Sequence, residues 1–250
     1  MNVYWLEQTV DQVPSGIDWL GPTEILHLET LRFPKRRMDW TLGRWTAKCA
    51  LAIVHDLPFS SDRLSKIEIR VSSSGAPEAF IADRGSDFSL SISHRSGVAM
   101  CALACKPIRL GCDLEVIEAR SDGFLEDYFT LEEQLLVADF PLADRARLVA
   151  LLWSAKESAL KALQLGLRAD TRSLRVDPQI TEAAGAWSPL HVRFNDLDSF
   201  GGWWREENGL LRTLVADIRH SVLPSPLHVG SNQSAAQRCS YDNTSRQDAM

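Results

Sequence analysis

The chain breaks at Lys106-Pro107, and this predicted hinge between two halves constrains the fold more than any other feature of the chain. Each side contains one long amphipathic helix pattern and several apolar strand patterns. Proline interrupts helices and strands alike, because its ring fixes φ and its nitrogen carries no hydrogen. We therefore predict an α+β fold divided into an N-terminal subdomain over residues 1–106 and a C-terminal subdomain over residues 107–220. The apolar runs at residues 98–104 and 211–216 give only a weak hint of a repeat, because no fixed period is visible.

The first half is predicted to combine one long helix with three strands. Hydrophobic residues recur at helical spacing over residues 36–54, and strand patterns cover residues 67–71, 88–92 and 98–104. Three basic residues on the helix stand at i, i+7 and i+11, on one line beside the apolar stripe: Arg37, Arg44 and Lys48. This line either borders a ligand site or forms an ordinary solvated helix face.

The second half is predicted to hold two helices, three strands and a tail. The helices cover residues 130–138 and about 145–165, and the strands cover residues 109–117, 191–197 and 210–218. From about residue 221 the chain is rich in Ser, Asn, Gln and Asp and loses its apolar periodicity. Residues 221–250 are therefore predicted to be a mostly disordered tail.

Composition points to an ordinary globular protein. Hydrophobic residues make up 45% of the chain, charged residues make up 24%, and no run approaches eighteen apolar residues. The five cysteines follow no zinc or disulfide spacing, so we expect reduced thiols and a cytoplasmic location without membrane contact. A net charge of −6 argues against nucleic-acid binding. Basic residues are nevertheless concentrated between positions 32 and 48, where they suit a small polyanionic ligand.

Two acidic residues share one face of a predicted strand. The even positions of residues 110–116 are apolar, which places Gly111, Asp113 and Glu115 together on the opposite face. Neighbouring carboxylates repel unless solvent or a cation neutralises them, and magnesium prefers such hard oxygen ligands. An exposed polar face on an edge strand explains the pair equally well, so the pair alone does not establish a metal site.

The helix over residues 145–165 carries a third acid. Glu157 projects from nearly the opposite side to the core stripe, and Lys161 follows it at i+4, as in an ordinary helix-stabilising ion pair. Trp153 and Leu160 flank Glu157, however, and a solvated face rarely carries two such side chains. We therefore predict that this face packs against another element and holds Glu157 in a cleft.

These two segments together resemble the paired signature motifs of the 4'-phosphopantetheinyl transferases, in the surfactin-synthetase-activating type. The first is Gly-Cys-Asp-Leu-Glu at residues 111–115, and the second is Trp-Ser-Ala-Lys-Glu-Ser-Ala-Leu-Lys at residues 153–161. Ser-Ile-Ser-His at residues 91–94 resembles the motif before the first signature, and the helix around Gly43-Arg44 resembles the N-terminal coenzyme A segment. The resemblance spans roughly residues 30–218.

The resemblance implies a fold and an activity. The fold would be two similar α/β subdomains in pseudo-twofold arrangement, with the active site at their interface. The activity would be Mg²⁺-dependent transfer, with Mn²⁺ as a substitute, of 4'-phosphopantetheine from coenzyme A to a serine of an apo acyl or peptidyl carrier protein. Adenosine 3',5'-bisphosphate would be released. Such carriers serve fatty-acid, polyketide or nonribosomal-peptide synthesis, and a chain with two halves can form the site as a monomer.

The resemblance also assigns roles to individual residues. The metal ligands would be Asp113, Glu115 and Glu157, with Glu133 as an accessory acid. Glu157 would also be the general base, and Lys161 would join it in catalysis. The coenzyme A contacts would be Arg37, Arg44, Lys48, Ser93, His94, Lys156 and Lys161.

One position departs from the family pattern and leaves alternatives open. Ala76 precedes Pro77 where the family often has a lysine or arginine, so a ligand contact is lost or replaced by Arg70 or Arg84. A non-catalytic module that binds coenzyme A or a carrier protein is one alternative. A metal-dependent phosphate-ester hydrolase is another, although the sequence lacks a denser cluster of Asp and His.

Overall fold

A computed structural model describes residues 2–179, 185–195, 198–217 and 223–229. Helices account for 37% and strands for 34% of the chain, which confirms the α+β class. The chain divides into two compact units. The first comprises Met1–Ser73, Pro77–Pro107 and Ser225–Met250, and the second comprises Ser74–Ala76 and Ile108–Pro224. Among the described residues, no helix is both long enough and apolar enough to cross a membrane.

The first unit packs one long helix, α2 (Pro34–Val54), against a sheet of order β12-β1-β6-β5. The strands of this sheet are β1 (Val3–Thr9), β5 (Phe88–Arg95), β6 (Val98–Cys105) and β12 (Ser225–Pro226). A second sheet of order β2-β3-β4 contains β2 (Ile67–Val71), β3 (Pro77–Ile81) and β4 (Arg84–Gly85). The remaining helices are α1 (Pro22–Thr30), α3 (Ser61–Leu64) and the short η1 (Val10–Gln12).

Part of the predicted tail belongs to the first unit. Ser225 and Pro226 form β12, which pairs in parallel with β1, and the Leu227 N–H donates to the carbonyl of Trp5 at 2.7 Å. This pairing differs from the predicted disorder, because two backbone partners on β1 compensate for the weak apolar pattern of the segment. Residues 221, 222 and 230–250 of the predicted tail lie outside the described residues, so the prediction of disorder stays a prediction for them.

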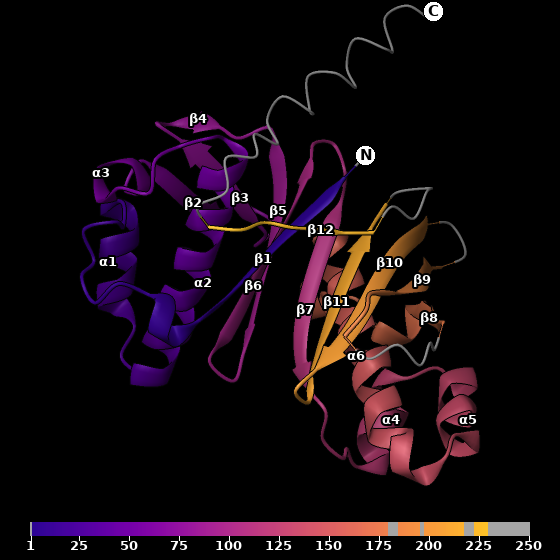
Figure 1. Cartoon of the computed structure of the whole chain (residues 1–250). Helices are drawn as coiled ribbons and strands as arrows, with labels where there is room; N and C mark the ends of the chain where they lie inside the picture. The colour runs from indigo at the N-terminus through magenta and orange to yellow at the C-terminus, as the bar shows by residue number, and fades with distance from the viewer. Residues whose placement is uncertain (1, 180–184, 196–197, 218–222, 230–250) are drawn as a thin grey trace, which may run out of the picture. The chain divides into compact units, whose positions relative to one another are not determined.

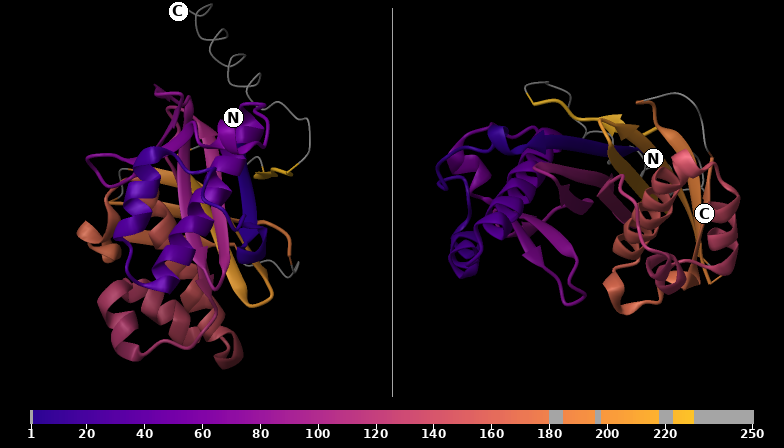
Figure 2. Two further views of the ribbon diagram at one scale, coloured as in Figure 1. Left: turned by 90° about the vertical axis from the view of Figure 1, so that its left-hand side faces the viewer. Right: turned by 90° about the horizontal axis from the view of Figure 1, so that it is seen from below.

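The second unit is a five-stranded sheet of order β7-β11-β10-β9-β8 with one long helix packed against it, while two shorter helices lie beside its end (Figure 1). Its strands are β7 (Leu110–Val116), β8 (Leu174–Pro178), β9 (Ser188–Phe194), β10 (Asp198–Glu207) and β11 (Leu210–Ala216). Its helices are α4 (Asp122–Tyr128), α5 (Leu131–Asp139) and α6 (Arg145–Ala162), with short turns η2 (Leu142–Asp144), η3 (Gly166–Arg168) and η4 (Thr171–Ser173). Figure 2 shows α6 lying along the sheet.

A glycine sets the distance between α6 and the edge strand β7. A Cβ atom on Gly111 would lie 1.8 Å from the carbonyl oxygen of Ser158 and 2.8 Å from the nitrogen of Ala162. Both atoms belong to the α6 backbone, so no side-chain rotation relieves the overlap. Only glycine therefore allows this close approach, which brings the next turn of α6 over Asp113.

We expect Gly111→Ala to destabilise the protein by about 3 kcal/mol, because α6 must move away from β7. Urea denaturation followed by circular dichroism measures the free energy of unfolding. Gly123→Ala is the matched control, since a Cβ there meets nothing within 4 Å. It should change stability by less than about 1 kcal/mol. Equal stability of the two variants would show that the α6–β7 contact tolerates a side chain.

A buried lysine of the first unit is held by a glutamate at the start of α1. The Nζ atom of Lys48, on α2, lies 2.6 Å from Glu24 Oε2 and donates to the carbonyls of Trp19 and Leu64, each at 3.0 Å. Glu24 in turn accepts from the backbone N–H of Gly21, which caps α1, and of Ile69 on β2. One ion pair thus ties two helices and a strand together.

The second unit also contains a buried lysine paired with a glutamate at the start of a helix. Lys156 on α6 lies 2.7 Å from Glu133 Oε2 and donates to the carbonyls of Thr171 and Leu174 at 2.8 and 2.9 Å. Glu133 accepts from the N–H of Thr130, which caps α5, and of Val176 on β8. Both lysine side chains are 0% exposed, so each pair stabilises only as a complete set of charges and hydrogen bonds.

Candidate functional site

The two predicted strand acids face α6. Asp113 and Glu115 lie on β7, each 7% exposed, while Leu110, Cys112 and Leu114 are buried on the opposite face of the strand. The predicted alternation along this strand is therefore confirmed. The strand is an edge strand, but the carboxylates do not form the exposed polar face that was the simpler explanation.

Two residues of α6 bind the Asp113 carboxylate. Lys161 Nζ donates to Asp113 Oδ1 at 2.8 Å and to the carbonyl of Cys112 at 2.9 Å. Ser154 Oγ donates to Asp113 Oδ2 at 3.0 Å. The close approach at Gly111 makes these contacts geometrically possible, because Lys161 lies between the two α6 residues at the contact, Ser158 and Ala162, and Ser154 lies one turn before Ser158.

Glu157 lies within electrostatic range of both strand acids. Burial raises the pKa of Glu157, and the negative charges of Asp113 and Glu115 raise it further, while Lys161 lowers it. Burial opposes the charged form of Lys161, but Asp113, Cys112 and Glu157 outweigh this effect and raise the pKa of Lys161. Three carboxylates and one ammonium group therefore form a single coupled cluster on the α6–β7 contact.

Glu115 also has a cationic partner. Arg120 Nη2 lies 2.6 Å from Glu115 Oε1 and 3.1 Å from Glu118 Oε1, and the Arg120 guanidinium sits over the Phe124 ring. Among the described residues, no three His, Cys, Asp or Glu side chains form a group that could hold a metal ion. As placed, the strand acids are neutralised by Lys161 and Arg120. The donors are nevertheless hard carboxylate oxygens, the type that magnesium prefers.

The face of α6 that carries Glu157 packs against another element, as predicted. The Trp153 ring meets the rings of Phe124 and Tyr128 on α4 edge-on, at centroid distances of 5.1 and 5.0 Å. Leu160 is also buried. These aromatic contacts fix the orientation of α4 beside the helix turn that presents Glu157.

Within the first unit, Ser93 and His94 lie on β5 beside α2. Ser93 is buried and His94 is exposed. A Cβ on Gly43 of α2 would lie 3.3 Å from Ile92 Cγ2 and 3.9 Å from His94 Cδ2, so the helix passes close to this strand at a residue without a side chain. The predicted histidine segment and the predicted basic helix are therefore neighbours.

The three predicted basic residues of α2 have internal partners. Arg37 donates to the carbonyls of Leu28 and Leu31 at the end of α1. Arg44 lies 3.7 Å from Glu24 and stacks over the Trp40 ring, and Lys48 is the fully buried partner of the same glutamate. Burial lowers the pKa of both Arg44 and Lys48, against the opposing charge of Glu24. The three basic residues thus do not form a solvated helix face. Lys48, which is fully buried, is also inaccessible to a ligand.

Exposed basic residues do occur nearby. Arg32, Lys35 and Arg36, at the start of α2, are all exposed. The sequence shows them as part of the same basic concentration, but helical periodicity alone favoured the line that proved internal. The exposed residues differ from Arg37, Arg44 and Lys48 in burial, and burial depends on contacts between α1 and α2 that periodicity does not show.

Lys156 and Glu133 are also placed away from solvent. Burial lowers the pKa of Lys156, and Glu133 opposes that effect. Since Lys156 has a carboxylate and two carbonyls as partners, its predicted phosphate contact does not fit this position. Glu133 likewise has both oxygens engaged in capping α5, bonding β8 and binding Lys156, so it does not fit an accessory metal ligand.

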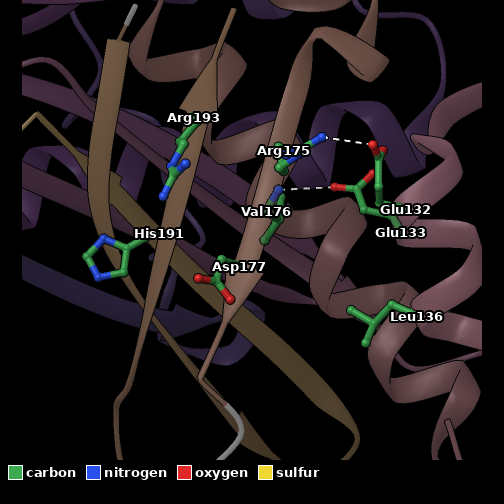
Figure 3. Close-up of a pocket in the computed structure, with 8 residues that line it drawn as sticks. All are labelled: Glu132, Glu133, Leu136, Arg175, Val176, Asp177, His191 and Arg193. Atoms are coloured by element: carbon green, nitrogen blue, oxygen red, sulfur yellow. Dashed lines mark hydrogen bonds and ion pairs between the residues drawn. The ribbon is translucent and has the colours of Figure 1, made fainter. Parts of the chain in front are cut away.

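Glu133 also lines a pocket of about 320 Å³ (Figure 3). It is lined by Glu132, Glu133, Leu136, Arg175, Val176, Asp177, His191 and Arg193. Arg175 pairs with Glu132 at 2.9 Å, while Arg193 stands directly opposite Arg175 on the neighbouring strand. Asp113, Glu115 and Glu157 do not line it, so this pocket is separate from the acid cluster.

The turn at Ala76 has a cation that sequence reasoning missed. Arg168 donates to the carbonyl of Ser74 at 2.8 Å, and Ser74 Oγ donates to Gln164 at 3.0 Å. Arg70 instead pairs with Glu68 and Asp83. The partners Ser154 and Arg120 of the two strand acids were also missed. The signature segment contains Ser154, but only the helix position over β7 gives its hydroxyl a role.

The sequence was compared with models of known protein families. Residues 109–218 match the model of the 4'-phosphopantetheinyl transferase superfamily, and the matched range lies within the second unit. It contains β7, α6 and the four charged residues of the α6–β7 contact, which are Asp113, Glu115, Glu157 and Lys161. No curated protein matches the chain. The family match supports a transferase that moves phosphopantetheine groups.

Proposed function

We propose that the protein is a magnesium-dependent 4'-phosphopantetheinyl transferase of the surfactin-synthetase-activating type. It would transfer the arm of coenzyme A to a serine of an apo acyl or peptidyl carrier protein. One observation carries the proposal: Asp113, Glu115, Glu157 and Lys161 form a coupled cluster on the α6–β7 contact, within the range that matches the superfamily. The pseudo-twofold arrangement, the monomeric state, the cytoplasmic location and the carrier pathway stay predictions.

Asp113, Glu115 and Glu157 are the residues that would hold the metal, once their carboxylates turn from the arrangement seen here, in which Lys161 and Arg120 neutralise the two strand acids. Their oxygens are suitable donors, and the mutual repulsion that raises the pKa of Glu157 is the kind that a divalent cation relieves. When bound, magnesium would neutralise charge on the pyrophosphate of coenzyme A.

The chain's own residues supply proton transfer and orientation. The serine oxygen of the carrier forms a bond to phosphorus, the pyrophosphate P–O bond breaks, and adenosine 3',5'-bisphosphate departs with the bond electrons. Glu157 would accept the serine proton, although a metal ion bound to the same carboxylate would lower its basicity. Lys161, with a 30% exposed side chain, would hold a phosphate oxygen beside Asp113.

The first unit would bind the nucleotide end of coenzyme A. His94 is exposed beside α2, and Arg32, Lys35 and Arg36 are exposed at the start of that helix. We propose these residues, with Ser93, Arg37 and Arg44 nearby, for the phosphate contacts. Lys48 and Lys156 are left out because both are fully buried in ion pairs.

Intact-mass analysis tests this function. We expect the protein, with coenzyme A and Mg²⁺, to add one phosphopantetheine group to at least one apo carrier in a panel of acyl and peptidyl carriers. Addition of EDTA should stop the reaction, and excess Mg²⁺ should restore it. Absence of the adduct across the panel would overturn the proposal. Tight coenzyme A binding without turnover would then favour the binding module, and carrier-independent release of inorganic phosphate would favour the hydrolase.

A further inference from the structure

Three buried hydroxyl groups lead from the interior of the second unit to the Asp113 carboxylate. Ser154 and Ser158 lie on α6, Thr213 lies on β11, and all three are 0% exposed. Ser154 Oγ is 3.0 Å from Asp113 Oδ2 and 2.8 Å from Thr213 Oγ1. Ser158 Oγ is 2.7 Å from the same Thr213 oxygen. The hydroxyls therefore form a continuous chain that ends on the carboxylate.

The placement of this chain follows from strand register and helix spacing. Asp113 and Thr213 are directly opposite each other on β7 and β11, so both side chains point to the same face of the sheet. Ser154 and Ser158 stand at i and i+4, which puts them on the same face of α6. The Gly111 contact presses this helix face onto the two strands.

The number of protons gives the chain a direction. Each hydroxyl has one proton, and an ionised carboxylate only accepts hydrogen bonds. Ser154 therefore donates to Asp113, so at its 2.8 Å contact with Thr213 it must accept. The one proton of Thr213 has two acceptors on Ser154, the backbone carbonyl at 2.9 Å and the hydroxyl at 2.8 Å, and the Ser158 hydroxyl lies 2.7 Å from the same Thr213 oxygen. The direction of donation is therefore fixed at the end of the chain, where Ser154 donates to the Asp113 carboxylate.

We propose that Ser154, Thr213 and Ser158 are positioning residues that fix the plane of the Asp113 carboxylate and stabilise its charge. The inference rests on the proposed function, in which Asp113 is a metal ligand. Ser154 holds Oδ2 while Lys161 holds Oδ1, so neither oxygen can rotate without breaking a hydrogen bond. Partners of metal-binding carboxylates act in this way by orienting the ligand.

Thr213→Val tests the proposal, because valine has the shape of threonine without its hydroxyl. Thr213→Ser is the matched control, since it keeps the hydroxyl and removes only a methyl group. The readouts are kcat and KM for coenzyme A, the Mg²⁺ concentration for half-maximal rate, and Mn²⁺ binding measured by electron paramagnetic resonance without carrier. We expect Thr213→Val to weaken Mn²⁺ binding and lower kcat by about 10- to 100-fold, with KM for coenzyme A little changed.

The control separates positioning from folding. Thr213→Ser should retain metal binding and kcat near the wild-type values even if its free energy of unfolding falls. Equal metal binding by the wild type and both variants, including no binding by any of them, would overturn the inference. A wild type that binds Mn²⁺ but modifies no carrier would overturn the proposed function alone, and the Mn²⁺ titration would still decide the role of the hydroxyl chain.

Discussion

Glu157→Gln is expected to lower carrier modification by at least about 100-fold while the protein stays folded. Glutamine keeps the size of the side chain but is neither a proton acceptor nor a good ligand for a hard cation. The pKa of Glu157 is raised by burial and by Asp113 and Glu115, so the folded protein disfavours the charged form more than the unfolded chain does. A neutral amide removes this penalty at pH 7, and the variant should be at least as stable as the wild type.

Rates from intact-mass time courses and unfolding curves in urea check this expectation together. Glu132→Gln is a suitable control, since Glu132 is an exposed acid on α5 whose partner is Arg175. It should leave the rate unchanged. A Glu157→Gln variant that transfers at the wild-type rate would remove Glu157 from the chemistry, and one that fails to fold would show that its charge has a structural partner.

Lys156→Met should mainly reduce stability and Lys161→Met should mainly reduce transfer activity, although both lysines lie in the same signature segment. Lys156→Met leaves Glu133 buried without a counter-charge, which should cost about 3–5 kcal/mol of stability. Lys161 is partly exposed and Asp113 keeps its bond from Ser154, so Lys161→Met should lose less stability. It should instead lose most of the transfer activity, because no other ammonium group of α6 binds Asp113 among the described residues.

Urea denaturation and the mass assay measure the two effects on the same samples. Lys48→Met offers a second control, since Lys48 and Glu24 form the corresponding device in the first unit and should be equally sensitive. The double variant Lys156→Met with Glu133→Gln should be more stable than the sum of the single changes predicts, because both charges leave together. A Lys156→Met variant with wild-type stability and no activity would instead support the predicted contact between Lys156 and a phosphate group.

Local patterns predicted the elements that carry the site with small errors. The alternation around Asp113 predicts a strand over residues 109–117, and β7 covers Leu110–Val116. The helix predicted over about 145–165 is α6, Arg145–Ala162. In both cases one face is apolar over the whole element, so the period is visible in the sequence. Six strands of the described residues were missed: β1, β3, β4, β8, β10 and β12. In β1 and β10 the buried positions include polar or small residues such as Gln8 and Gly202, which hide the strand pattern.

The residue roles could be predicted less well than the elements. Spacing alone treats Lys48, Lys156 and Lys161 as similar cations on amphipathic helices. Only the capping glutamates of α1 and α5, which reach across from other elements, make the first two internal. Periodicity reports which face of a helix a residue occupies, but it carries no information about which other side chain comes to meet that face.

The sequence by itself determined the α+β class and the strand and helix that carry Asp113, Glu115 and Glu157. Both depend on periodicity within single segments and on motif spacing. Only the tertiary structure decided which charges remain available. The contact at Gly111 brings Ser154, Glu157 and Lys161 over Asp113, whereas the capping of α5 draws Lys156 and Glu133 into the core. The physical reason is that burial and ion pairing depend on contacts between segments distant in sequence, which no local pattern encodes.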